Sequence, residues 1–358
     1  MKKVLLTGGG TLGSVVPLIA LAEELGNRCQ YYWLGTAEGP ERAVVTDAGI
    51  SFQAIRAGKL RRYLHWRNFV DPFLSMAGFV QAWQFCRKWK PDLVVSAGGF
   101  VAVPVVWAAK MCGAKVLLYQ LDVRPGLANR LCLKAANKVA VVWPQTKAFF
   151  GDKAVLGRAQ VRRALHVQAR QTDAAGFKQQ FSLRVELPLV LVTGGGTGAQ
   201  GLNKLLIETL PDLIGNCVVL HATGKGRGLS GQPDTPDYRA IDFLSQEQMA
   251  QALAVSAVVV SRAGMGTLSE LSYSAKPVIL VPLPDSHQEE NADLVVKAEA
   301  AILIKQGSDP QKLAQAILLF IRKQPDAQEL GDRLKKLLSG EEGSSLTKLA
   351  LDLLHEGL

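Results

Sequence analysis

Residues 3–14 read KVLLTGGGTLGS, and residues 188–199 read PLVLVTGGGTGA. In both stretches a short apolar run stops at three glycines, and a helical pattern follows. Uninterrupted apolar runs of this length are typical of parallel strands that are buried on both faces. Such runs, with helical patterns between them, recur at 92–96, 115–119, 217–220, 257–261 and 277–281. The alternation predicts an α/β fold with doubly wound parallel sheets and right-handed crossovers.

The two matching stretches divide the chain into similar halves. A chain of 358 residues is longer than one domain with a single hydrophobic core usually is, and its length suits two domains. We expect an N-terminal domain over 1–160 and a C-terminal domain over 161–343, followed by a short amphipathic helix at about 344–358. Ligands of such sheets bind beyond the carboxyl ends of the strands, so two facing domains predict a cleft between them.

Composition and charge narrow the function classes. The five cysteines are scattered without a CxxC pair, which argues against a disulfide framework or a zinc site and suits a reducing cytoplasm. The sequence shows neither a signal peptide nor an apolar run long enough to span a membrane, so we expect a soluble protein. Residues 1–157 carry 20 Lys and Arg against 9 Asp and Glu, and the remainder carries 21 against 22. The basic half favours an anionic partner.

The glycine turns are candidate phosphate sites. Glycine lets backbone N–H groups approach a phosphate, and the following helix N-terminus adds partial positive charge. Neither turn is a Walker A loop, and neither has the acidic residue that a dinucleotide site needs about twenty positions later. The alternative for each turn alone is a tight strand–helix connection.

The segment 261–271 is more specific. A strand ends, small residues make a turn, and a helix begins, which places Glu270 near the start of the helix, where its carboxylate could accept both hydroxyls of a ribose. The alternative is that Glu270 only complements the helix dipole. After the next strand, Gln288 and Asn291 are well placed to bind sugar hydroxyls. His287 is either part of that site or a structural histidine.

These segments resemble the motifs of the MurG family of glycosyltransferases. The family's loops GGTGGH, GGY and GGSQGA are similar to residues 9–14, 98–100 and 194–199. The order is kept from the first strand to beyond residue 300. The family's donor signature RxGxxTxxE and its trailing HQxxNA are matched by Arg262, Gly264, Thr267, Glu270, His287, Gln288, Asn291 and Ala292.

The resemblance implies the GT-B fold, with two Rossmann-like domains, and inverting transfer of N-acetylglucosamine (GlcNAc) from UDP-GlcNAc. The acceptor would be the lipid-pyrophosphate-linked muramoyl-peptide, lipid I, which becomes lipid II in peptidoglycan synthesis. In this fold the C-terminal helix commonly packs back on the first domain. Glu270 would contact the ribose, Gln288 the sugar and Arg162 the diphosphate. Other implied donor contacts are Gly196, Thr197, Phe243, Leu244, Arg262, Gly264, Thr267, His287 and Asn291. The implied acceptor and diphosphate loops contain Gly10, Thr11, Leu12, Gly13, Gly98, Gly99, Phe100 and Asn129.

Three positions depart from the family pattern. The histidine of the first loop is Ser14, which can donate a hydrogen bond but cannot take a proton at neutral pH. The family's HEQN is replaced by residues 119–122, reading YQLD, so the carboxylate moves to Asp122. The serine of the third loop is Gly196, with Thr197 beside it. The donor side is therefore kept better than the acceptor side.

The chemistry needs a base for the acceptor hydroxyl and positive charge for the leaving UDP. We expect Asp122 to be the base, with Ser14 as a further catalytic residue. The alternative is that Asp122 caps a helix or stabilises a turn. No DxD motif lies where a divalent metal would be needed, so we expect no cofactor and no metal.

A basic stretch at 58–90 is a candidate membrane contact. It holds seven Lys and Arg against one acid, Asp71. Asp71 as N-cap and Pro72 at the first helical position predict a helix start. Basic flanks beside aromatic residues suit anionic lipid. The loop 58–67 is preferred as the contact, because the alternative for the helix itself is a core helix. Nucleic acid is a poor rival, since no binding module surrounds the stretch. We expect a cytoplasmic protein, peripheral on the inner face of the plasma membrane.

Three other functions stay open. One is a UDP-sugar transferase of the same fold with another lipid or glycan acceptor. A second is a UDP-sugar 2-epimerase, which shares the architecture but needs its own acid–base set. A third is a homologue that binds UDP-sugar without turnover.

Overall fold

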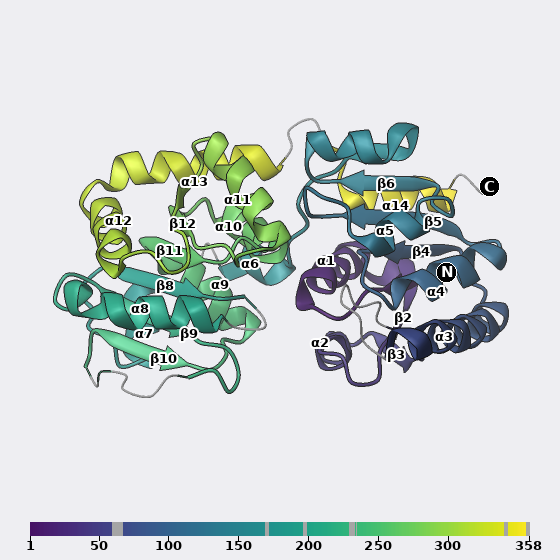
Figure 1. Cartoon of the computed structure of the whole chain (residues 1–358), viewed down its shortest axis with the longest axis horizontal. Helices are drawn as coiled ribbons and strands as arrows, with labels where there is room; N and C mark the ends of the chain where they lie inside the picture. Colours follow the sequence, from purple (N-terminus) through teal and green to yellow (C-terminus); the bar gives the residue numbers. More distant parts are fainter. Residues whose placement is uncertain are drawn as a thin grey trace. The chain divides into compact units, whose positions relative to one another are not determined.

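The computed structural model describes residues 1–58, 67–168, 172–195, 199–228, 233, 235–339 and 343–355. It forms two compact units, one of Met1–Arg162 with Gly340–Leu358 and one of Arg163–Ser339. Each unit contains one parallel sheet with helices on both faces (Figure 1). The predicted α/β fold class is confirmed.

The first unit has a seven-stranded sheet in the order β3-β2-β1-β4-β5-β6-β7. The apolar run that opens the chain becomes β1, the third strand in this order, and Val4, Leu5 and Leu6 are fully buried. This follows from parallel pairing on both edges with helices on both faces. The strands are β1 (Lys2–Thr7), β2 (Cys29–Gly35), β3 (Ser51–Ala54), β4 (Leu93–Ser96), β5 (Lys115–Gln120), β6 (Lys138–Val141) and β7 (Ala154–Leu156).

Helices cover both faces of this sheet. The C-terminal helix α14 (Leu346–His355) lies against α1, β4 and β5, so the end of the chain completes the first unit (Figure 1). The α-helices are α1 (Val16–Leu25), α2 (Glu41–Asp47), α3 (Arg67–Trp89), α4 (Ala102–Met111), α5 (Leu127–Cys132) and α14, and the 3₁₀ turns are Leu12–Ser14, Gly26–Arg28, Pro144–Phe149 and Gly151–Lys153.

Helix α3 corrects one prediction. It begins at Arg67, so Asp71 is not its N-cap and Pro72 lies inside it. The N–H groups of a first helical turn have no intrahelical partner, and Pro72 stands just beyond that turn. The proline therefore removes only one backbone hydrogen bond, and the helix can start earlier than the proline indicates. No helix among the described residues combines the length and the apolar character that crossing a membrane requires.

The second unit has a six-stranded sheet in the order β10-β9-β8-β11-β12-β13. Strand β8 is third in this order, as β1 is in the first unit, and its neighbour β9 corresponds to β2. The strands are β8 (Leu189–Thr193), β9 (Val218–Ala222), β10 (Tyr238–Ile241), β11 (Val258–Ser261), β12 (Val278–Leu280) and β13 (Ile302–Leu303). The helices are α6 (Arg163–Gln168), α7 (Ala174–Gln180), α8 (Gln200–Leu213), α9 (Gln246–Val255), α10 (Met265–Ser274), α11 (His287–Lys297), α12 (Pro310–Arg322) and α13 (Gln324–Ser339).

Candidate functional site

In the second unit, the glycine turn after β8 lies beside the start of α10. Thr193 pairs with Ser261 across β8 and β11, so both turns leave the same edge of the sheet. Gly195 has φ +79°, and its N–H donates to Thr193 Oγ1 at 3.2 Å. A methyl group on Gly195 would stand 3.4 Å from Thr267 Oγ1. The turn after β8 therefore lies close to the first turn of α10. Gly196 and Thr197 lie outside the described residues.

The start of α10 has the form of an anion site. Gly264 is the N-cap, so no side chain occupies the end of the helix, where unpaired N–H groups and the helix dipole favour an anion. Asn291 is fully buried and donates from Nδ2 to Ala263 O at 3.1 Å, which fixes the turn before the helix. Glu270 follows on the second turn of α10 and is half-buried.

The Arg262 side chain forms hydrogen bonds within the second unit. Its side chain is buried, and Nη1 donates to Val281 O and Pro282 O, both at 2.9 Å. Nη2 donates to Gln306 Oε1 at 2.5 Å. Burial lowers the pKa of this guanidinium. These bonds give Arg262 a structural role, because they hold the exit of β12 that leads to α11. A direct contact of Arg262 with the donor stays a prediction.

The start of α11 carries the next predicted residues. Ser286 is the N-cap, and its Oγ accepts from Gln288 N–H at 3.2 Å. Gln288 Oε1 accepts from Leu283 N–H at 3.0 Å, and Gln288 Nε2 would stand 3.8 Å from a methyl group on Gly264. The Gln288 amide therefore lies near the N-terminus of α10, whereas His287 is exposed.

Phe243 and Leu244 follow β10 and differ in burial. Leu244 is buried, and Phe243 exposes 62% of its surface. The preceding backbone is tied to the exit of β9, because Thr223 N–H donates to Ile241 O at 2.9 Å and Gly224 N–H donates to Asp242 O at 3.0 Å. An exposed ring on a fixed backbone is suited to contact with a nucleobase.

In the first unit, the turn after β1 meets the turn after β4. Gly99 has φ +88°, and a methyl group there would collide with the Gly9 carbonyl oxygen. A methyl group on Gly10 would stand 3.2 Å from the Phe100 ring, and one on Gly98 would stand 3.3 Å from Asn129 Oδ1. The structure therefore brings together the two predicted loops and Asn129.

The rest of the first loop forms the 3₁₀ turn Leu12–Ser14, preceded by Thr11. Ser14 Oγ donates to Thr11 O at 3.2 Å and is partly exposed, and Gly13 is exposed. The Ser14 hydroxyl therefore donates its hydrogen bond within its own loop.

The loop that carries Asp122 is held by buried amides. Gln120 Nε2 donates to Asp122 O at 2.7 Å and to Arg124 O at 3.2 Å, and Thr146 Oγ1 donates to Val123 O at 2.7 Å. Asn129 Nδ2 in turn donates to Gln120 Oε1 at 2.7 Å. Asp122 is half-buried and is no helix cap, because Gly126 is the N-cap of α5. The helix-cap alternative is wrong, and the alternative of a turn aspartate stays a prediction. The Gln120 amide holds the backbone of Asp122.

Arg162, expected near a diphosphate, belongs to the first unit in this structure. Its Nε donates to Glu23 Oε1 at 2.9 Å, and Nη2 contacts the same oxygen. Gln160 Nε2 donates to Glu24 Oε2 at 2.7 Å. Buried Tyr119 donates to Arg158 O at 2.9 Å and accepts from Gln160 N–H at 3.1 Å. Residues 158–162 are thus held to α1 and β5.

Glu41 is a functional candidate that sequence reasoning missed. It is fully buried, and its Oε1 accepts from Thr36 N–H at 2.9 Å. Its Oε2 accepts from Gly10 N–H at 3.4 Å, and a methyl group on Gly9 would stand 2.5 Å from Oε1. In the sequence, an acid at the start of a helix only suggests a favourable dipole. Its contact with a turn thirty residues away has no local signal.

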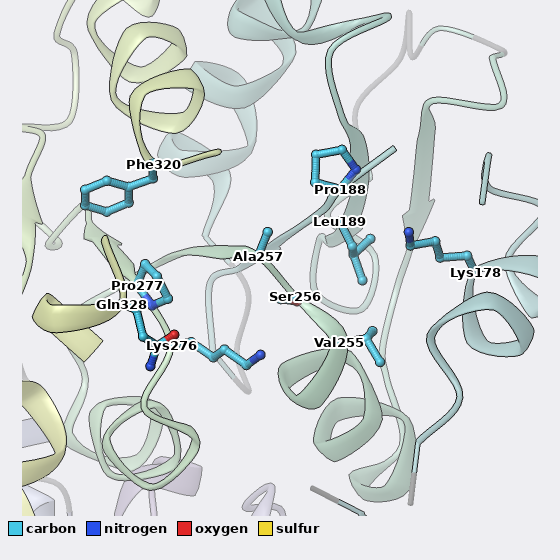
Figure 2. Close-up of a pocket in the computed structure, with 10 residues that line it drawn as sticks. All are labelled: Lys178, Pro188, Leu189, Val255, Ser256, Ala257, Lys276, Pro277, Phe320 and Gln328. Carbon is cyan, nitrogen blue, oxygen red and sulfur yellow. The ribbon is translucent and has the colours of Figure 1, made fainter. Parts of the chain in front are cut away.

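The second unit also has a pocket of about 320 Å³, and Figure 2 shows the residues that line it. It is lined by residues at the amino ends of β8, β11 and β12, which is the opposite edge of the sheet. Lys276 Nζ donates to Ala254 O at 2.7 Å, and Lys178 Nζ donates to Val185 O and Leu187 O. Burial lowers the pKa of both lysines. Their bonds to loop carbonyls indicate a structural role. Among the described residues, no group of His, Cys, Asp or Glu has the arrangement of a metal site.

Comparison with known proteins identifies the family. Residues 4–141 match the glycosyltransferase family 28 N-terminal domain, and residues 189–342 match the C-terminal domain of that family. A relative from Lachnospira eligens is 37% identical over 302 residues, which cover 84% of this chain and 83% of the relative. A relative from Geobacillus thermodenitrificans is 33% identical over 362 residues, which cover 98% of each chain. Both are named UDP-N-acetylglucosamine–N-acetylmuramyl-(pentapeptide) pyrophosphoryl-undecaprenol N-acetylglucosamine transferase.

Solved structures agree in fold. The structure of Acinetobacter baumannii MurG superposes with a TM-score of 0.72 at 24% identity, over 99% of this chain and 100% of that one. A UDP-GlcNAc 2-epimerase from Neisseria meningitidis gives a TM-score of 0.70 at 16% identity, over 99% and 100%. At these identities the likeness concerns the two-domain GT-B fold, which transferases and epimerases share. On the family domains and the relatives that match most of its length, this chain belongs to the MurG family of glycosyltransferases, within glycosyltransferase family 28.

Proposed function

We propose that this protein is an inverting glycosyltransferase that moves GlcNAc from UDP-GlcNAc to lipid I, giving lipid II. The observation that carries the proposal is the 33–37% identity, over most of the chain, to relatives named for this transfer. The shared epimerase architecture concerns fold alone and favours no second function.

On the donor side, we propose that the diphosphate of UDP binds where the turn after β8 meets the N-terminus of α10. Support comes from the closeness of Gly195 to Thr267 and from the uncapped helix start at Gly264. Glu270 would accept the ribose hydroxyls, Gln288 would contact the sugar, and Phe243 would cover the uracil. Each of these groups lies on or beside the carboxyl edge of the second sheet.

On the acceptor side, we propose Asp122 as the base that takes the proton of the acceptor hydroxyl. Support comes from its loop at the exit of β5. Gln120 donates to the Asp122 carbonyl, and two further hydrogen bonds from Gln120 and Thr146 hold the next residues of the loop. A base must be held within hydrogen-bond reach of its proton, so a fixed loop suits this role better than a mobile one. Ser14 would assist as a hydrogen-bond donor.

We further propose that the protein works at the cytoplasmic face of an anionic membrane. Helix α3 exposes Phe73 and Met76 by 76% and 63%, and Val80 by 42%, at a spacing that places them on one side of the helix. Basic residues of the stretch 58–90 flank this apolar side in the sequence. The predicted loop contact at 58–67 falls almost wholly outside the described residues. The fraction of protein that sediments with phosphatidylglycerol vesicles should fall when Phe73 and Met76 are both replaced by Ser. It should stay unchanged when Met111, which is also exposed, is replaced by Ser.

The test of the transfer is UDP release from UDP-GlcNAc, with and without a short-chain lipid I analogue, in EDTA and in Mg²⁺. We expect release that depends on the lipid and persists in EDTA. The Asp122→Asn variant should lower turnover ~10²-fold with unchanged UDP binding, because only proton transfer is lost. The matched control is Asp152→Asn, an exposed acid of the same unit. UDP binding without release from the wild-type protein would contradict the acceptor assignment, and normal turnover in Asp122→Asn would remove the base.

A further inference from the structure

The turn that follows β9 carries two cations to the edge where the nucleotide is proposed to bind. In the register of β8 and β9, Thr193 pairs with Ala222, so Thr223 and Gly224 leave the sheet beside Gly194 and Gly195. The turn spans Thr223–Arg227 and is called the β9 turn below. On its other side, its backbone pairs with the exit of β10, just before Phe243.

The β9 turn has a defined shape. Arg227 N–H donates to Gly224 O at 3.0 Å, which closes a β-turn, and Gly224 and Gly226 have φ of +93° and +67°. Glycine takes these angles without strain. The side chain of Lys225 is exposed and that of Arg227 is half-buried. Within the described part of the chain, neither cation forms an ion pair with a carboxylate.

A buried side chain on α8 holds both ends of the β9 turn. Asn203 is fully buried, and its Nδ2 donates to Thr223 O at 3.0 Å and to Arg227 O at 3.2 Å. Helix α8 follows the glycine turn after β8 directly. Asn203 therefore links the elements on either side of the proposed diphosphate position.

Asn203 is in turn oriented by a buried histidine. Its Oδ1 lies 3.1 Å from His221 Nε2, and His221 Nδ1 lies 2.9 Å from the Tyr238 hydroxyl. Since the Asn203 oxygen can only accept, His221 carries its proton on Nε2 and accepts from Tyr238 through Nδ1. Burial lowers the pKa of His221 to about 4, so the ring is neutral and this orientation persists at neutral pH.

The cation expected from family resemblance is engaged elsewhere. Arg162 pairs with Glu23 in the first unit, and Arg262 is bound to carbonyl groups of its own unit. Lys225 and Arg227 belong to the second unit itself, in a turn that leaves the sheet next to the turn after β8. A leaving diphosphate needs such charges held close to its oxygens.

We propose that Lys225 and Arg227 bind the diphosphate of the nucleotide sugar, and that Asn203 is the positioning residue that holds them there. The proposal rests on the proposed function, in that it takes UDP-GlcNAc as the donor. It adds a cationic contact from the second unit to the backbone N–H groups of the glycine turn and of α10.

The test compares UDP with uridine by calorimetry on the full chain. In the double variant Lys225→Ala with Arg227→Ala, UDP affinity should fall about tenfold or more, because charge-assisted hydrogen bonds to the phosphates are lost. Uridine affinity should stay within about twofold. The control is Lys204→Ala with Lys312→Ala, two exposed lysines of the same unit that change the net charge equally.

The outcomes separate the two proposals. If the wild-type protein binds UDP and the double variant binds it equally well, the role of the β9 turn is overturned and the proposed donor is kept. The same holds if the double variant weakens UDP binding no more than the lysine control does. A wild-type protein that binds no UDP overturns the proposed donor, and the inference with it.

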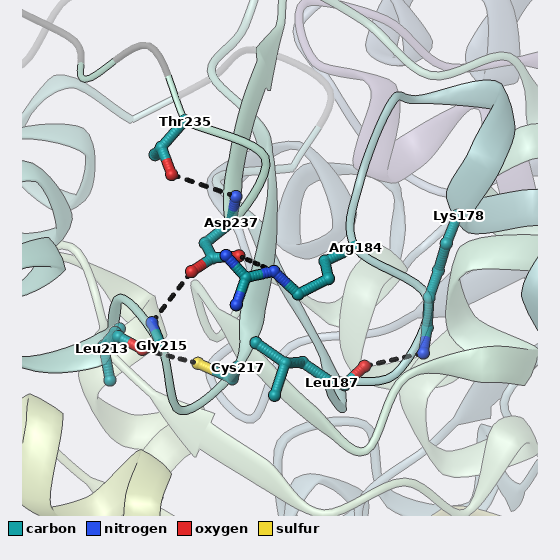
Figure 3. Close-up of polar contacts among 8 residues, drawn as sticks. All are labelled: Lys178, Arg184, Leu187, Leu213, Gly215, Cys217, Thr235 and Asp237. Carbon is teal, nitrogen blue, oxygen red and sulfur yellow. Dashed lines mark hydrogen bonds and ion pairs between the residues drawn. The ribbon is translucent and has the colours of Figure 1, made fainter.

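The role of Asn203 is tested with Asn203→Leu, which keeps the size and removes the hydrogen bonds. UDP affinity of the folded protein should fall about tenfold, together with its melting temperature. The control is Asp237→Asn, whose contacts to Gly215 at 2.9 Å and to Arg184 at 3.1 Å lie at the amino end of β9 (Figure 3). That variant should lose stability and keep UDP affinity. If Asn203→Leu loses only stability, Asn203 is structural and holds no cation for the nucleotide.

Discussion

The two glycine turns have nearly the same sequence and opposite surroundings. After β1, Gly9 passes against the buried Glu41 carboxylate, which accepts the N–H of Gly10. After β8, Gly195 lies close to the hydroxyl of Thr267, and its own N–H donates to Thr193 Oγ1. The turn after β1 therefore lies beside a carboxylate, and the turn after β8 lies beside neutral hydroxyl groups.

The strands beside the turns repeat this contrast. β2 and β9 occupy equivalent places next to β1 and β8. The segment after β2 contributes Glu41, whereas the segment after β9 contributes Lys225 and Arg227, held by neutral Asn203. A buried carboxylate repels a diphosphate and takes up an N–H that could bind one. A glycine turn therefore permits phosphate binding, and the side chains around it decide whether that binding is favourable.

The largest expected effect is that of Gly9→Ala. The added methyl group would stand 2.5 Å from Glu41 Oε1, and the carboxylate is fixed by Thr36. We expect the first unit to lose about 3 kcal/mol of unfolding free energy or more, as overpacked sites do. All six tryptophans lie in Met1–Arg162, so tryptophan fluorescence in urea reports on this unit selectively.

Gly49→Ala provides the control for that measurement. Gly49 also belongs to the first unit and has φ +73°, but no atom lies within 4 Å of a methyl group there. Its cost should be limited to backbone strain, about 1 kcal/mol. Equal losses of unfolding free energy in the two variants would show that the Glu41 side chain moves to make room for the methyl group. The first turn would then be no more constrained than an open loop.

The second effect concerns pH and the second unit. Burial lowers the pKa of His221 from 6.5 to about 4. As the pH falls from 6.5 to 4, the unfolded chain takes up a proton at this site and the folded chain does not. Unfolding free energy is therefore lost over this window, by roughly 3 kcal/mol, and the site contributes no pH dependence above it.

Calorimetric unfolding of wild type and His221→Gln between pH 7 and 4 measures this contribution. Glutamine can still hydrogen-bond to Asn203 and Tyr238 but does not titrate, so the variant should show the shallower pH dependence. Parallel curves for the two proteins would mean that His221 takes up its proton in the folded state, and that the network behind the second turn tolerates charge.

The sequence predicted the parts of this comparison that depend on local pattern. Apolar runs before Gly8 and Gly194 predicted the strands β1 and β8, and the confirmed fold class follows from them. The roles of Glu41 and Asn203 could not be predicted, because each acts on backbone far away in the chain. The pairing of Arg162 with Glu23 is a similar long-range contact. The start of α3 was misplaced, since Asp71 and Pro72 give a strong local signal for a helix start that the fold overrides.

The third effect is that of Glu41→Gln. The amide can still accept from Thr36, but the charge is lost and an NH₂ group faces the Gly10 N–H. We expect a loss of about 2 kcal/mol in the first unit, since hydrogen bonds to a charged group are replaced and one donor is left unpaired. Tryptophan fluorescence in urea measures it. UDP affinity should be unchanged, and a loss of UDP affinity comparable to the loss of stability would assign the first turn to the nucleotide instead.

The smallest effect on stability is expected for Gly195→Ala, the counterpart of Gly9→Ala in the second turn. Its methyl group would stand 3.4 Å from Thr267 Oγ1, an ordinary contact distance, so the cost is the strain of φ +79°, about 1 kcal/mol. UDP affinity should nevertheless fall, because the methyl group occupies the face where the backbone must approach a phosphate. Calorimetric unfolding and UDP titration of the same sample give both quantities. Gly9→Ala should show the reverse, with a large loss of stability and intact UDP binding in the second unit. If both variants instead lose stability to the same extent, or both lose UDP affinity, the two turns are equivalent. The Glu41 carboxylate would then not distinguish the ligands of the two turns.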